Sequence, residues 1–87
     1  MKLIWITDAK YMKDYTLKLF FNDGEEREFD FSSLWGTHPM YDSIRNMETF
    51  KKFEMDGWSI SWLGGKVDVS PEYLYFQSKQ LENNISM

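Results

Sequence analysis

The stretch YTLKLFFNDGEEREFDF, residues 15–31, decides the fold of this chain. Apolar side chains recur at every second position in its first part, residues 15–21, and alternation returns over residues 26–31. A period of two residues is typical of β-strands with one buried face. Between the two runs lies Asn-Asp-Gly, three residues that favour turns. The stretch therefore predicts a β-hairpin.

The length of this turn follows from the side chains that each register would pair. A two-residue loop would set the leucine and phenylalanine side chains of the first strand opposite acidic residues. A three-residue loop, residues 22–24, instead places Leu17 beside Phe29 and Tyr15 beside Phe31. A slip of one residue moves every side chain to the other face. We therefore predict the three-residue loop, with its glycine in the left-handed conformation.

Two further segments extend the sheet. KLIWIT, residues 2–7, has the β-branched and aromatic content of a first strand. A second Asp-Gly pair, residues 56–57, predicts another hairpin. A two-residue turn there lets Phe53 face Ile60, whereas a three-residue turn would put charged side chains among tryptophans. We therefore expect a tight primed turn.

Residues 32–50, the crossover, connect the two hairpins and follow neither the helix nor the strand period. Ser32-Ser33 is predicted to start a single helical turn, and residues 42–47 to form another. Gly36 and Pro39 punctuate the segment. We therefore expect short helical turns instead of a regular element.

The C-terminal segment predicts a helix of about ten residues, ending at Gln80 or Leu81. Ser70 is a favourable N-cap, Pro71 fits the first helical position, and Glu72 complements the helix dipole in the first turn. The predicted inward stripe is Tyr73, Leu74 and Leu81, with Gln77 between them. ENNISM, residues 82–87, is predicted to fray.

The composition bounds the fold class. Eighty-seven residues make at most one domain, and a chain this short must build its core from a few large side chains. It has 4 Trp, 5 Tyr and 7 Phe, with a single alanine, and this balance favours strands. We predict an α+β domain over residues 1–81. It would have a twisted, mainly antiparallel sheet of about five strands, namely two hairpins plus the N-terminal strand, with a C-terminal helix and helical turns in the crossover.

Charge and cysteine content exclude several classes of protein. Acidic residues outnumber basic ones 14 to 10, so a basic patch for nucleic acid is not expected, nor is attraction to an anionic membrane. The absence of cysteine excludes disulfides and thiol chemistry. Neither a signal peptide nor a membrane span is evident. We expect a soluble, cytoplasmic protein.

No pattern of residues predicts catalysis, a metal or a cofactor. His38 is the only histidine, and its neighbours lack a nucleophile elbow, so we expect a solvent-facing loop residue. The glycines of WLGGK, residues 62–66, lack the spacing of a phosphate-binding loop. The strand acids Glu26, Glu28 and Asp30 share a face and are predicted to be solvated. The chain is therefore not expected to be an enzyme.

Aromatic side chains remain the candidates for recognition, because exposed aromatics are typical of interfaces. Tyr75 and Phe76 fall off the predicted inward stripe of the C-terminal helix. Trp35 lies in the irregular crossover. These three residues are the candidate contacts with a partner, either another protein or a second copy of the chain.

The stretch WLGGKVDVSPEYLY, residues 62–75, resembles the closing signature of a small prokaryotic family called domain of unknown function 2442. The signature runs approximately Trp-Pro-Asn-Gly-x-Asp-[Leu/Ile/Val]-x-Pro-Glu-x-Leu-Tyr. The matching residues are Trp62, Asp68, Pro71, Glu72, Leu74 and Tyr75. Leu63 stands where the signature has proline, and one extra residue precedes Asp68. The likeness covers most of residues 1–77, including the first hairpin.

The resemblance implies a small α+β domain without established catalytic residues. Some members are fused to a helix-turn-helix domain, and others are encoded beside a second short protein in a toxin–antitoxin-like arrangement. Within the signature, an aspartate on a glycine-rich segment suggests either a site or a joint between strand and helix. We favour the strand-to-helix joint, formed by Trp62, Asp68, Ser70, Pro71 and Glu72, because the Asp68 carboxylate could support the helix N-terminus.

Two functional hypotheses follow. The first is a non-enzymatic protein-binding or regulatory module, in its specific form an antitoxin-like partner in a two-protein system, whose acidic surface covers a basic one. The alternative is a small-molecule or peptide sensor with a pocket between the sheet and the crossover.

Overall fold

The computed structural model describes residues 3–80 and contains two small antiparallel sheets. Across the first sheet the order is β1 (Ile6–Lys13), β2 (Thr16–Phe21), β3 (Glu26–Asp30) and β7 (Lys79–Gln80). The second comprises β4 (Glu54–Met55), β5 (Ile60–Trp62) and β6 (Val67–Asp68). The helices are η1 (Phe31–Leu34), η2 (Pro39–Arg45), α1 (Met47–Lys51), η3 (Leu63–Gly65) and α2 (Pro71–Gln77). The α+β class is confirmed, although the strands divide between two sheets.

The first hairpin has the predicted register. Leu17 pairs with Phe29 across β2 and β3. The Phe21 N–H donates to the Glu25 carbonyl at 2.9 Å, which closes a loop of three residues, 22–24. Gly24 has a φ of +89°, the left-handed region that glycine enters without a steric penalty. Burial of the alternating leucine and phenylalanine side chains therefore selects this register.

The first strand lies further along the chain than predicted. It spans Ile6–Lys13, whereas the composition suggested residues 2–7. Residues 8–13 lack a clear apolar alternation and are extended because β2 offers them backbone partners. Before that ladder, the Ile6 N–H donates to the Trp58 carbonyl at 2.9 Å, so the start of β1 also attaches the loop of the second hairpin.

The predicted two-residue turn in the second hairpin is wrong. Met55 pairs with Ile60, which leaves a four-residue loop, 56–59. The Asp56 carboxylate accepts hydrogen bonds from the N–H groups of Trp58 and Ser59, at 2.9 and 2.8 Å. These bonds lower the pKa of Asp56 and hold the wider loop.

The first predicted turn of the crossover forms as η1, and the second forms as η2, which begins at Pro39, three residues before the predicted segment 42–47. The sequence analysis did not predict α1, which follows η2 directly. Its N-cap is Asn46, whose side-chain oxygen accepts from the Thr49 N–H at 3.0 Å. His38 is exposed, as expected, and its Nδ1 accepts from the Met40 N–H at the start of η2.

The last helix begins as predicted and ends early. The Ser70 hydroxyl accepts from the Tyr73 N–H, and Pro71 occupies the first turn. The helix ends at Gln77, and Ser78 caps it. The Ser78 N–H donates to the Leu74 carbonyl, and the Ser78 hydroxyl donates to the Tyr75 carbonyl. The chain then turns into β7 along the edge of β3. Leu81 and the expected tail, residues 82–87, lie outside the described residues.

The predicted inward stripe of this helix is partly wrong. Leu74 is fully buried, as expected, and Pro71 is buried with it. Tyr75 also turns inward and packs on the core, whereas Tyr73 is 43% exposed and Gln77 is exposed. The buried and half-buried residues, at positions 71, 74, 75 and 78, have the spacing of one face of a helix.

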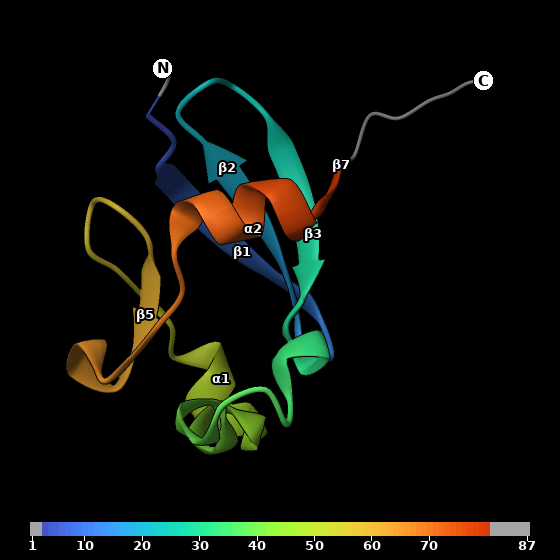
Figure 1. Ribbon diagram of the computed structural model, residues 1–87, viewed down its shortest axis with the longest axis vertical. Coiled ribbons are helices and arrows are strands. Elements are labelled where there is room, and N and C mark those ends of the chain that lie inside the picture. Colours follow the sequence, from blue (N-terminus) through green and yellow to red (C-terminus); the bar gives the residue numbers. More distant parts are fainter. Residues whose placement is uncertain (1–2, 81–87) are drawn as a thin grey trace.

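Trp62 connects the parts of the molecule. In Figure 1, α2 lies across the first sheet, β5 stands beside that layer, and α1 lies at its end. The fully buried Trp62 ring stacks on Phe50 of α1 and meets Phe31 of η1 edge-on. Its indole N–H donates to the Phe50 carbonyl at 2.8 Å. One side chain of the second sheet thus holds α1 and η1 around a common core.

We predict that Trp62→Phe lowers the free energy of unfolding by about 2–4 kcal/mol, because it leaves a cavity and an unpaired carbonyl. The matched control is Trp58→Phe, at a residue that is 43% exposed, which should cost less than about 1 kcal/mol. Urea unfolding followed by far-UV circular dichroism measures both. Equal losses in the two variants would contradict this role of Trp62.

Candidate functional site

The strand-to-helix joint divides into buried and exposed residues. Trp62 and Pro71 are buried, and Ser70 caps the helix. The exposed Glu72 carboxylate accepts from the Ser70 hydroxyl at 3.0 Å. These four side chains therefore support the connection between the second sheet and α2.

Asp68 is placed differently from the other joint residues. Its backbone pairs with Ser61 in the second sheet, and its side chain is exposed. Within residues 3–80, its carboxylate accepts no hydrogen bond and forms no ion pair, so the expected support of the helix N-terminus comes from Ser70 instead. Asp68 thus presents an exposed carboxylate without a hydrogen-bond or ion-pair partner among residues 3–80, whereas that of Glu72 accepts from Ser70.

Asp68 lies beside a cleft of about 470 Å³ between the crossover and the joint. The crossover contributes residues from η1 to η2, and the joint contributes β6 and the first turn of α2. The lining residues are Leu34, Thr37, Met40, Tyr41, Asp68, Val69, Ser70 and Tyr73. Leu34 and Val69 are buried, while Met40 and Tyr41 are half-buried. The cleft therefore combines apolar side chains with two tyrosines and one carboxylate.

The surroundings of Tyr41, one of the two tyrosines that line the cleft, favour its neutral form. Burial raises the pKa of Tyr41 above its ordinary value of 10.0, with further contributions from Tyr73 and Asp68. At neutral pH Tyr41 is a neutral ring with a hydroxyl group. Asp68 is then the charged group among the residues that line the cleft.

A second, smaller cleft lies on the other side of residues 68–70. Its volume is about 300 Å³, and it is lined by Asp56, Trp58, Ser59, Asp68, Val69, Ser70, Pro71 and Glu72.

Among residues 3–80, no group of three or more histidine, cysteine, aspartate or glutamate side chains is arranged to hold a metal ion. In the same part of the chain, no helix is long and apolar enough to cross a membrane.

The three candidate partner contacts have different surroundings. Phe76 is 73% exposed on the outer side of α2. Trp35 is half-buried, with the Tyr15 ring in a T-shaped contact and the Arg45 guanidinium 5.8 Å from its ring centre. Tyr75 is also half-buried and points into the fold. Phe76 therefore offers the largest exposed apolar surface of the three.

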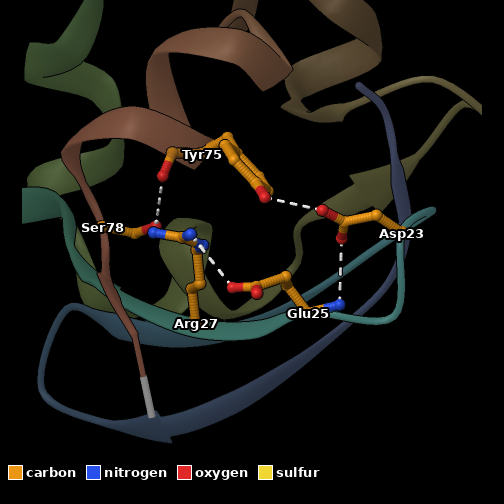
Figure 2. Close-up of polar contacts among 5 residues, drawn as sticks. All are labelled: Asp23, Glu25, Arg27, Tyr75 and Ser78. Carbon is orange, nitrogen blue, oxygen red and sulfur yellow. Dashed lines mark hydrogen bonds and ion pairs between the residues drawn. The ribbon is translucent and has the colours of Figure 1, made fainter. Parts of the chain in front are cut away.

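Figure 2 shows what Tyr75 does within the fold. Its hydroxyl donates to Asp23 Oδ2 at 2.6 Å, which ties α2 to the turn of the first hairpin. The Arg27 guanidinium lies 4.1 Å from the centre of the Tyr75 ring and pairs with Glu25 at 3.0 Å. Asp23 also accepts from the Glu25 N–H at 3.0 Å. Tyr75 thus holds the helix on the sheet.

No sequence pattern indicated Tyr41 and Tyr73 as residues of the cleft. Tyr73 was predicted to face inward, and Tyr41 had no pattern to distinguish it in an irregular segment. Their convergence depends on the path of the crossover, for which no local signal exists. Asp68 alone carried a signal, as an isolated acid after a glycine pair.

We predict that Tyr75→Phe costs about 0.5–1.5 kcal/mol at pH 7, since it removes the hydrogen bond to Asp23 and keeps the ring. That bond comes first among the causes that raise the Tyr75 pKa above 10.0. The unfolded chain therefore loses the Tyr75 proton first, and the stabilisation present below pH 10 declines as the pH rises further. Urea unfolding between pH 7 and 11 should show a shallower alkaline decline in the variant. Parallel curves would contradict the assignment.

The comparisons with known proteins agree with the resemblance seen in the signature. The model of a family described as "Protein of unknown function (DUF2442)" matches residues 6–80, most of the chain. No curated protein and no solved structure gives a significant match. The chain belongs to the DUF2442 family of proteins of unknown function.

Proposed function

We propose that this protein is a non-enzymatic protein-binding module with a regulatory role. The observation that carries the proposal is the outer side of α2, where Phe76 is 73% exposed and Tyr73 is 43% exposed. Residues three apart are neighbours on a helix surface. Tyr73 also lines the 470 Å³ cleft, so the two rings connect an exposed apolar anchor with a concave surface.

The partner that fits this surface is a protein with a basic face. The chain has a net charge of −4, and two exposed carboxylates lie near Tyr73: Asp68 lines the same cleft, and Glu72 precedes Tyr73 in the chain. Opposite charges around an apolar anchor speed association and select the partner, while the buried aromatic anchors supply most of the affinity. The specific form that we propose is an antitoxin-like partner in a two-protein system, on the strength of the family resemblance.

The test is affinity capture of the tagged chain from its native lysate, followed by binding measurements with the purified partner. Phe76→Ala should weaken binding by at least about tenfold, since removing a central aromatic anchor costs about 2 kcal/mol or more. Met12→Ala is the control, because Met12 is 42% exposed on β1 and lies outside this surface. Equal affinity of Phe76→Ala and the parent chain, or the absence of any stoichiometric partner, would refute the proposal.

The cleft also supports the second candidate, a small-molecule or peptide sensor. A volume of about 470 Å³ lies within the range of small-ligand sites. The expected result is an increase in melting temperature with one ligand class, because a ligand that binds the folded state stabilises it. Met40→Trp, at a half-buried residue that lines the cleft, should abolish the shift. A screen without any shift would count against the sensor.

A further inference from the structure

We propose that the cleft between the crossover and the joint binds a cationic side chain, a lysine ammonium or an arginine guanidinium, of the protein partner. This inference rests on the proposed function and names the group that the partner inserts. It follows from three observations: the volume and apolar lining residues of the cleft, the two tyrosines that line it, and the Asp68 carboxylate, which has no ion-pair partner within residues 3–80.

The apolar side chains that line the cleft suit the aliphatic stem of a long cationic side chain. Leu34 and Val69 are buried, and Met40 is half-buried beside them. Lysine and arginine lay their methylene groups along apolar surface and keep the charged end at a polar site. The volume of about 470 Å³ is ample for one such side chain.

The charged end of that side chain would meet Tyr41, Tyr73 and Asp68. Neutral tyrosine rings attract cations through their faces. Asp68 forms no ion pair within residues 3–80, whereas Lys18 and Arg27 have partners elsewhere, in Glu26 and Glu25. An anionic group would be repelled by Asp68, and a neutral group that covered it would leave a desolvated carboxylate without compensation. A cation is therefore the ligand class that satisfies the cleft.

The same combination of groups already occurs inside this fold. In Figure 2, the Arg27 guanidinium lies over the Tyr75 ring at 4.1 Å, while the Tyr75 hydroxyl donates to a carboxylate, that of Asp23. The cleft offers tyrosine rings and a carboxylate without the cation. The internal contact shows that a guanidinium, a tyrosine ring and carboxylates pack together in this fold.

The experiment is a titration of the ¹⁵N-labelled chain, followed by NMR, with two probes. These are N-acetyl-lysine methylamide and its apolar analogue N-acetyl-norleucine methylamide. The lysine probe should bind about fivefold more tightly and shift the amide signals of Tyr41, Asp68 and Tyr73. Asp68→Asn should abolish this preference, and Glu48→Gln, an equal change of charge at an exposed residue of α1, should retain it.

Replacement of one ring separates the aromatic contribution from the charge. Tyr41→Leu should lower the affinity for the lysine probe about threefold, and Tyr41→Phe should leave this affinity unchanged. Equal binding of the two probes to the parent chain, or equal effects of Asp68→Asn and Glu48→Gln, would overturn the inference.

These experiments distinguish failure of the cation site from failure of the proposed protein-binding function. If the lysine probe shows no preference while a partner is still captured through Phe76, the cationic group is wrong and the binding module stands. If the probe binds as expected and no partner is captured, the cleft remains a cation site and the protein-binding proposal fails.

Discussion

The arrangement of this small domain depends on the burial of Trp62. Its ring lies between Phe50 and Phe31, and its indole N–H satisfies the Phe50 carbonyl at 2.8 Å. Through these contacts a strand of only three residues joins the second sheet to the crossover helices. A chain of 87 residues can bury little surface, so one large aromatic residue has to contact several elements at once.

The position of the cleft follows from that arrangement. Trp62 holds β5 beside the crossover, and the next strand, β6, then carries Asp68 to the surface next to η2. Tyr75 performs the corresponding task for the helix, because its bond to Asp23 fixes α2 on the first hairpin. The outer side of α2 is thereby turned outward with Tyr73 and Phe76. The buried and exposed residues of the signature thus have separate tasks.

The departure from the family signature has a local consequence. Leu63, which stands in place of proline, has a φ of +57°. Proline is confined to a φ near −65°, so a proline could not adopt this conformation. Gly64 and Gly65 follow with φ values of +67° and +93°. The three residues make a left-handed turn that suits this sequence and would not suit the signature, and it lies immediately before β6 and the cleft.

Local sequence patterns were enough to predict the features that depend on neighbours along the chain: the three-residue turn and register of the first hairpin, the Ser70 cap and Pro71 start of α2, and the η1 turn. Each follows from side-chain alternation or local backbone preference. Contacts between distant segments set the limits of β1, the four-residue loop after Met55 and the buried side of α2. They also bring Tyr41, Asp68 and Tyr73 together around the cleft. These features depend on backbone partners and packing surfaces that lie far away in the sequence, and local patterns carry no record of them.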